Sequence, residues 1–255
     1  MKSNKVVLEV KSLTKDYVDN TGYKIRLFED LSFTIHENEF TVILAPYGSG
    51  KSTLLKILSG TETGFEGEII KSDERISALI ADTPTSLQWK SVKENIKFTA
   101  KDVSEREIQK AIDAVGLTGY EDFSPHPKSY GFRLRIELAR ALAKNPLIVL
   151  IDDALDNIND EKTRFELLLK LRELNKIYDK TTFLFATNNL TDGLFASDKL
   201  LLMSKHPGKI IERYEISFPE ERDASLIDLE EFLELRNSIL IKYKDANDKF
   251  LTVKV

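Results

Sequence analysis

Cysteine is absent from this chain of 255 residues, which excludes disulfide bridges and thiolate metal sites and fits a reducing cytosol. A basic excess is absent too: the formal net charge is -5, so we expect no nucleic acid as a partner. No segment approaches the roughly twenty apolar residues that a membrane helix requires, and the first residues lack the apolar run of a signal peptide. We therefore expect a cytoplasmic chain that reaches a membrane only through another subunit.

Histidine is scarce as well. The three histidines, His36, His126 and His206, lie far from any second ligand at metal spacing, so we expect them in turns or at the surface. What the chain does have is ordinary for a globular protein, with 42% hydrophobic and 31% charged residues. At this length it can bury a substantial core, as one large α/β domain or as one domain with an elaborated subdomain.

The order of apolar patterns predicts an α/β fold with a mostly parallel sheet, an N-terminal antiparallel β subdomain and an inserted helical subdomain. Within the helical block, Ser104 and Glu107 fit a capping box. Strand patterns occupy 6–40, 41–44, 75–81, 147–152 and 181–187, and helical patterns occupy 52–60, 92–145, 160–177 and 225–243, before a short end KFLTVKV.

A glycine-rich stretch, APYGSGKST, stands between the apolar strand at 41–44 and the helix that follows, which is the context of a phosphate-binding loop. In such a loop backbone N–H groups and the helix N-terminus face the phosphates, Lys51 adds a full charge, and Ser52 can ligate magnesium. The pattern's first glycine is replaced by Ala45, which costs little if its φ is negative. The loop residues are Ala45, Pro46, Tyr47, Gly48, Ser49, Gly50, Lys51, Ser52 and Thr53.

Three further segments complete a resemblance to the nucleotide-binding subunit of ATP-binding cassette (ABC) transporters: LTKDY before the loop, SYGFRLRIELARALAKNPLIVLIDD, and TNNLTDGLFASDKLLLMSKHPGKI. The resemblance covers nearly the whole chain and implies a P-loop NTPase core that binds ATP and Mg²⁺. It implies that adenine stacks on Tyr17, that Asp152 reaches magnesium, and that Ser129 and Gly131 of the signature loop contact the nucleotide of a partner subunit. It also implies an ABC nucleotide-binding domain at 1–218, with a helical subdomain at about 83–145, and a C-terminal helical extension at 219–255.

Within that family, the segments ASDKLLLMSKHPGKI, LQWKSVKENI and FPEERD resemble the importers of nitrate, sulfonates and taurine. This branch implies a transmembrane permease, a solute-binding protein, a small solute such as an organic anion, and a place on the inner face of the membrane. Trp89 matches an aromatic near the family's permease-contacting surface, and packing within its own domain is the alternative role of that side chain.

Several residues that face the γ-phosphate in this family are altered here. Asp153 replaces the glutamate that polarises the attacking water, Asn188 replaces a histidine that contacts the γ-phosphate, and Asp82 stands where a glutamine ligates magnesium. A shorter carboxylate can still accept a proton, so slow hydrolysis is a better expectation than none. In the signature loop Lys128 replaces a leucine and Tyr130 replaces a glycine of the family pattern, and Asn159 replaces an aspartate.

These departures leave two functions open. The leading hypothesis is the ATP-binding subunit of an ABC importer, which couples ATP binding and slow hydrolysis to transport. The alternative is a hydrolysis-deficient regulatory or structural subunit of an ABC complex. A permease-free ABC protein ranks third, because the chain has neither a second cassette nor a coiled-coil insertion. In a homodimer both nucleotide sites are altered, and in a heterodimer with an intact ABC subunit neither site is fully intact.

Overall fold

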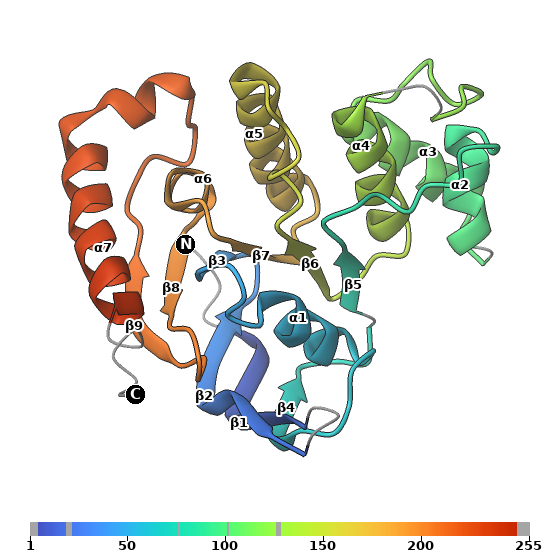
Figure 1. Cartoon of the computed structure of the whole chain (residues 1–255). Helices are drawn as coiled ribbons and strands as arrows, with labels where there is room; N and C mark the ends of the chain where they lie inside the picture. Colours follow the sequence, from blue (N-terminus) through green and yellow to red (C-terminus); the bar gives the residue numbers. More distant parts are fainter. Residues whose placement is uncertain (1–4, 19–21, 76, 101, 126–128, 249–255) are drawn as a thin grey trace.

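The structure is a computed structural model, and it describes residues 5–18, 22–75, 77–100, 102–125 and 129–248. Its described part contains two sheets (Figure 1). The six-stranded sheet has the order β5-β6-β7-β3-β8-β9, and the three-stranded sheet has the order β2-β1-β4. The strands are β1 (Val6–Val18), β2 (Lys24–His36), β3 (Phe40–Leu44), β4 (Glu66–Lys71), β5 (Ser77–Ile80), β6 (Ile148–Asp152), β7 (Thr182–Thr187), β8 (Lys199–Met203) and β9 (Ile210–Glu215).

The larger sheet is parallel except at β9, which pairs antiparallel with β8. Every residue of β3, β6, β7 and β8 is buried, as expected for apolar strands covered on both faces. Because parallel strands run in one direction, the loops after β3, β6 and β7 meet at one edge of the sheet. The predicted α/β fold with an antiparallel N-terminal sheet is confirmed.

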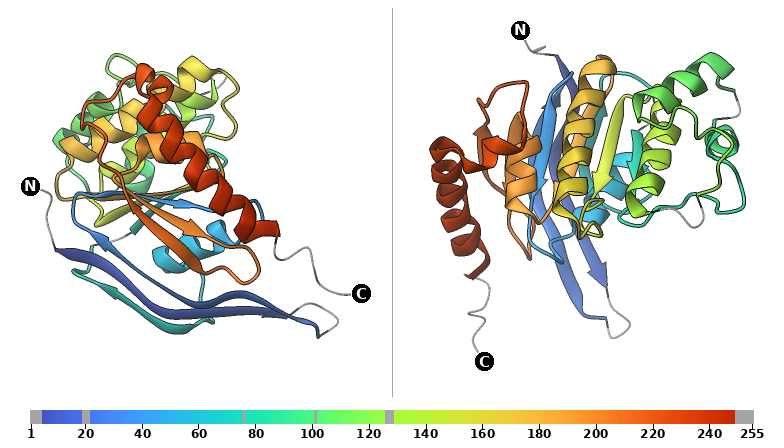
Figure 2. Two further views of the ribbon diagram at one scale, coloured as in Figure 1. Left: turned by 90° about the vertical axis from the view of Figure 1, so that its left-hand side faces the viewer. Right: turned by 90° about the horizontal axis from the view of Figure 1, so that it is seen from above.

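Helices cover the two faces of this sheet differently (Figures 1 and 2). Helix α1 lies between the two sheets, whereas α5 and α6 lie on the opposite face. Helices α2 to α4 form the block at the β5 end, and α7 lies at the far end, beside β9. The helices are α1 (Lys51–Ser59), α2 (Val92–Thr99), α3 (Glu105–Ala114), α4 (Tyr130–Leu142), α5 (Glu161–Ile177), α6 (Leu190–Ala196), the 3-10 helix η1 (Ala224–Asp228) and α7 (Glu230–Asp248).

Capping side chains mark the start of most of these helices, whereas α1 begins after Gly50 with no side-chain cap. The predicted capping box at the start of α3 is confirmed, with the Ser104 hydroxyl accepting from the Glu107 N–H and the Glu107 carboxylate accepting from the Ser104 N–H. The single helix expected over 225–243 is instead divided at Leu229, whose ψ of 139° is extended and separates η1 from α7. Residues of the KFLTVKV end lie outside the described part, and the boundary at residue 218 stays a prediction.

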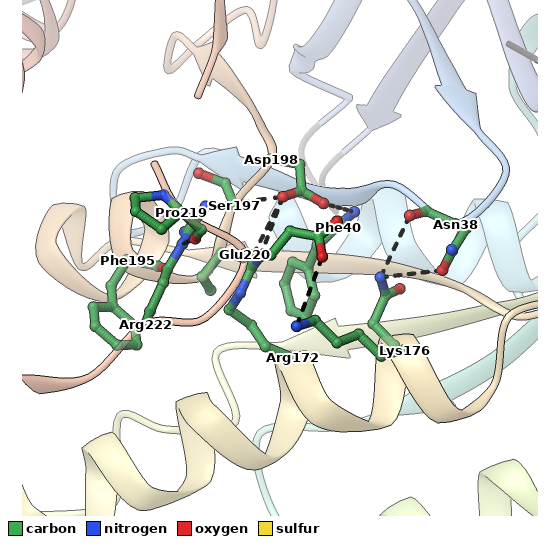
Figure 3. Close-up of polar contacts among 12 residues, drawn as sticks. Asn38, Phe40, Arg172, Lys176, Phe195, Ser197, Asp198, Pro219, Glu220 and Arg222 are labelled. Carbon is green, nitrogen blue, oxygen red and sulfur yellow. Dashed lines mark hydrogen bonds and ion pairs between the residues drawn. The ribbon is translucent and has the colours of Figure 1, made fainter. Parts of the chain in front are cut away.

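A buried ion cluster ties the segment after β9 to the sheet (Figure 3). The Asp198 carboxylate accepts a hydrogen bond from the Phe40 N–H at 3.0 Å and lies 3.3 Å from Arg172 Nη1 and 3.8 Å from Arg222 Nη2. Arg222 also donates to the carbonyl oxygens of Phe195 and Pro219. Burial lowers the pKa of Arg222 to about 10, so the guanidinium stays charged and depends on Asp198 for its counter-charge.

Candidate functional site

The phosphate loop joins β3 to α1 at the edge where the loops of the parallel strands meet. Gly50 has a φ of +96°, and a Cβ built on it lies 2.9 Å from the ring of Phe28, so a larger residue fits neither the backbone nor the space. Ala45 is buried, has no positive φ, and donates its N–H to Thr187 O at 3.0 Å. The glycine-to-alanine change at the first position of the loop is therefore tolerated without backbone strain.

A cavity of about 550 Å³ opens in front of this loop. It brings together ten of the residues predicted from the sequence with three others. Tyr17, 40% exposed, stands on its wall, and its ring lies 5.0 Å from the Lys15 ammonium. The cavity is lined by Tyr17, Leu27, Tyr47, Gly48, Gly50, Lys51, Ser52, Thr53, Asp82, Asp152, Asp153, Asp156 and Asn157.

Lys51 is the one lysine of this lining, and its ammonium already has partners on its own chain. Its Nζ lies 3.0 Å from Asp153 Oδ2 and donates to Ala45 O at 3.3 Å and to Pro46 O at 3.4 Å. The side chain is 4% exposed. A phosphate that binds in the loop must therefore compete with Asp153 for this cation.

Asp153 is held in a left-handed conformation, with a φ of 42° that non-glycine residues seldom adopt. Its N–H donates to Ala186 O at 2.9 Å, and its Oδ1 accepts from the Asn188 N–H at 3.2 Å. Burial raises the pKa of Asp153 to about 6, and the nearby Lys51 opposes that rise. The carboxylate is thus fixed between the loop lysine and the end of β7.

Asp152 offers the chemistry of a metal ligand. It is 6% exposed, and its Oδ1 has no hydrogen-bond partner in the described part of the chain. Burial raises its pKa, a side-chain hydrogen bond with Ser52 lowers it, and the charge of Asp82 raises it. A hard divalent cation takes such oxygen ligands, and Ser52, Asp152 and Asp82 fit one that also has phosphate oxygens as ligands. Among the described residues no three His, Cys, Asp or Glu side chains form a metal cluster by themselves.

Asn188 lies at the end of β7 but does not line the cavity. Its Nδ2 donates to Asp156 Oδ2 at 3.0 Å, which turns the amide toward the loop after β6. Asn159 lines a second cavity of about 380 Å³, beside Asn189 and Asp192. Asn188 and Asn159, which both differ from the family pattern, therefore lie in the loops after β6 and β7 and do not line the cavity in front of the phosphate loop.

The signature segment begins α4 and does not line the cavity of its own chain. The Ser129 hydroxyl caps the helix by accepting from the Phe132 N–H at 3.3 Å, and Gly131 is buried against α5. Tyr130 turns inward, and its hydroxyl donates to the carbonyl oxygen of Asp82. Lys128 and His126 lie outside the described residues.

Three cavity residues were missed by sequence reasoning: Leu27, Asp156 and Asn157. The sequence did contain a signal for Asp156. It lies three residues after Asp153, and when a turn closes between these two positions both acidic side chains lie near the same cavity. The hydrogen bond from the Asp156 N–H to Asp153 O, at 3.1 Å, closes this turn. Leu27 left no signal, since it reaches the cavity from the other sheet.

The comparisons with known sequences point in one direction. A family model described as "ABC transporter" matches residues 28–156. An uncharacterized ABC transporter ATP-binding protein of Methanocaldococcus jannaschii is 33% identical over 255 residues, covering 94% of this chain and 92% of that protein. The aliphatic sulfonates import ATP-binding protein SsuB of Bacillus cereus is 30% identical over 251 residues, covering 94% of this chain and 96% of that protein.

Solved structures share the fold at lower identity. CbiO1 of Clostridium perfringens, part of an ABC transporter complex, has a TM-score of 0.75 and 19% identity, and the match covers 92% of this chain and 96% of that one. A dimeric ATP-binding cassette bound to ADP and Pi has a TM-score of 0.69 and 22% identity, covering 83% of this chain and 100% of that one. Across the described residues, no helix is both long and apolar enough to span a membrane.

Proposed function

Because the chain belongs to the ABC transporter family, we propose that it is the ATP-binding subunit of a membrane importer and binds Mg·ATP in the cavity at its phosphate loop. The observation that carries this proposal is the composition of that cavity. It joins a half-exposed aromatic ring, Tyr17, to a buried loop lysine, Lys51, and to a buried carboxylate with an unpartnered oxygen, Asp152. Adenine stacks on an aromatic ring, the triphosphate needs a positive charge, and the magnesium ion needs a carboxylate oxygen as a ligand.

The cavity residues divide the work of binding. Tyr17 offers its face to the adenine, the loop from Ala45 to Thr53 offers backbone N–H groups and the α1 N-terminus to the phosphates, and Lys51 supplies the charge. Ser52, Asp152 and Asp82 are the residues that would hold Mg²⁺. The ion, when bound, neutralises phosphate charge and orients the β- and γ-phosphates.

Hydrolysis is proposed to be slow. Asp153 carries the carboxylate that would polarise the attacking water, yet its two oxygens are engaged by Lys51 and by the Asn188 N–H. Asn188 directs its amide to Asp156. A misplacement of about 1 Å costs on the order of a hundredfold in rate. The turnover rate therefore depends on how closely the Asp153 carboxylate approaches the water that attacks the γ-phosphate. The same contacts favour the second candidate, a regulatory subunit that closes on ATP without hydrolysing it.

The proposed partners follow from two surfaces. Ser129 and Gly131 lie outside their own cavity, which fits a head-to-tail pair, as a homodimer or with another ABC subunit, in which they reach the partner's nucleotide. A groove of about 320 Å³ between α1, β5 and α4, lined by Thr85, Arg140 and other residues, lies at the subdomain joint, and Trp89 is 78% exposed. We propose this region as the contact for a transmembrane permease, which would hold the chain at the inner face of the membrane.

The proposed solute is a small organic anion. Relatives named as aliphatic sulfonate importers, together with the family segments quoted above, support this class. Recognition of that solute would lie in the permease and in a solute-binding protein, because the cavity of this chain is built for a nucleotide.

The proposal is tested by Mg·ATP turnover of the purified chain, with Lys51→Ala measured as the control for contaminating ATPase. We expect slow turnover, well below the order of 1 s⁻¹ that is typical of working enzymes. Asp153→Glu, which restores one methylene, is expected to raise the rate by about tenfold or more, because the carboxylate then extends toward the γ-phosphate. If wild type and Asp153→Glu both bind nucleotide but do not hydrolyse it, the result favours the regulatory subunit. If wild type does not bind nucleotide, both candidate functions are contradicted.

The pH dependence of ATP binding offers a second check. The pKa of Asp153 is raised to about 6 in the free protein. Binding of ATP without Mg²⁺, in EDTA, adds phosphate charge and draws Lys51 away from Asp153, and both effects raise that pKa further. We therefore expect the wild type to take up a proton on binding at pH values just above 6, and to bind ATP more tightly as the pH falls through this range.

This uptake is measured by titration calorimetry in buffers with different ionisation enthalpies. Asp153→Asn is the matched variant, because it keeps the size of the side chain and cannot be protonated. The γ-phosphate of ATP titrates equally in both experiments, so the difference between them belongs to Asp153. Equal proton uptake by the two proteins contradicts the assignment.

A further inference from the structure

Three segments meet at one atom, the carbonyl oxygen of Asp82. The Tyr130 hydroxyl, at the start of α4, donates to this oxygen, and Asn157 Nδ2, in the loop after β6, donates to it at 3.1 Å. We call this set of contacts the Tyr130–Asp82–Asn157 clasp. Asp82 and Asn157 both line the nucleotide cavity, whereas Tyr130 belongs to the helical subdomain. The clasp therefore links that subdomain to the cavity within one chain.

The side chain of Tyr130 is suited to this link. Only a long side chain with a terminal donor reaches from the first residue of α4 to the Asp82 backbone, and the glycine of the family pattern has none. Burial raises the pKa of Tyr130, so the hydroxyl keeps its proton and remains a donor. Asp82 itself lies in no helix or strand, and its carbonyl oxygen accepts from both donors of the clasp.

The position of the clasp allows it to restrict movement of the helical subdomain. Helix α4 has 13 residues and is about 20 Å long, and its C-terminal end leads within a few residues into β6. Tyr130 lies at the other end of the helix. Asp82, just after β5, is where the chain leaves the sheet for the helical subdomain. The clasp therefore pins the free end of α4 to the start of the inserted segment, which limits rotation of the subdomain.

We propose that Tyr130 is a positioning residue that fixes Asp82 at the nucleotide cavity and ties the signature segment to it. Tyr130 holds Asp82 in place in the free chain, without nucleotide. The effect of this contact on Mg·ATP binding rests on the proposed function. Ser129 and Gly131 flank Tyr130, so a shift of Asp82 on binding Mg·ATP moves the segment that faces the partner subunit. Tyr130 departs from the family pattern of the signature loop, and in this chain its side chain couples that loop to Asp82.

Tyr130→Phe tests the proposal, because it removes the hydroxyl and keeps the ring. The matched control is Tyr178→Phe at the end of α5, which removes a buried tyrosine hydroxyl with no hydrogen-bond partner in the described part of the chain. Hydrogen exchange is measured without nucleotide in segment 82–90 and in the first turns of α4. The anisotropy of Trp89, the single tryptophan, reports on the same segment.

We expect Tyr130→Phe to raise exchange in both segments by about threefold to tenfold, the effect of one lost neutral hydrogen bond, and to leave α5 unchanged. Exchange equal to that of wild type and of Tyr178→Phe overturns the proposal. Because this comparison needs no nucleotide, it is independent of the proposed function, which fails instead if wild type does not bind ATP.

A readout on binding separates positioning from a general loosening of the chain. Asp82 is proposed to ligate magnesium, so Tyr130→Phe is expected to reduce the gain in ATP affinity that Mg²⁺ provides by about threefold or more, while ATP affinity in EDTA stays the same. An equal loss of affinity with and without Mg²⁺ overturns the positioning role.

Discussion

Lys51→Met is expected to weaken ATP binding by about 30-fold to 4,000-fold, the largest binding effect of any single change in this chain. The variant removes the cation of the phosphate loop, which is 4% exposed and therefore little screened by water. Truncation of one partner of a buried charge pair costs about 2–5 kcal/mol in affinity, which corresponds to this range. Methionine keeps the length of the side chain, so the loop retains its packing.

The measurement is a nucleotide titration by calorimetry at constant pH and ionic strength. Lys56→Met is the matched control, because Lys56 lies on the same helix but is exposed and does not line the cavity. We expect its affinity to stay within about twofold of wild type, as for a screened surface charge. Similar affinities for all three proteins would show that phosphates do not bind in this loop.

The ion pair between Lys51 and Asp153 makes a further comparison informative. Lys51→Met leaves the partly buried Asp153 carboxylate, 17% exposed, without its cation, and this alone raises the pKa of Asp153 and lowers the stability of the fold. The double variant Lys51→Met with Asp153→Asn removes that penalty. We expect the double variant to recover stability and to remain defective in ATP binding, because the lost interaction with phosphate is not restored.

Asp198→Asn is expected to lower the free energy of unfolding by about 3–5 kcal/mol, the largest stability effect of a conservative change in this chain. The carboxylate faces Arg172 and Arg222, whose side chains are 9% and 0% exposed. Asparagine keeps the shape and leaves two buried guanidinium groups without an anion. Since domains are stable by only about 5–15 kcal/mol, the variant is expected to unfold at a much lower urea concentration.

Urea unfolding followed by circular dichroism measures this effect. Glu220→Gln is the control from the same region, since Glu220 is 75% exposed and lies 3.9 Å from Lys176, and a change within about 0.5 kcal/mol is expected. Arg222→Met is expected to cost less than Asp198→Asn, because Arg172 then still neutralises Asp198. The reverse order would show that the Asp198 carboxylate is not the centre of the cluster.

Local patterns predicted much of this fold correctly. The apolar run at 41–44, the glycines after it and the helix that follows are neighbours in the sequence, so their geometry depends on few long-range contacts. The start of α3 was predictable for the same reason, because a capping box is closed within four residues. The break at Leu229 was not predictable, since the pattern of apolar residues continues through it, whereas in the structure η1 and α7 each contact α6 on either side of the break.

The candidate site divides in the same way. The sequence by itself determined the phosphate loop, the family and the substitutions at Asp82, Asp153 and Asn188, because each is read from residues close together in the chain. Only the tertiary structure decided what these side chains contact: Asp153 pairs with Lys51, and Tyr130 reaches Asp82, 48 residues earlier in the chain. Such contacts depend on how parallel strands bring distant loops to one edge of a sheet, and that arrangement leaves no periodic signal in the sequence.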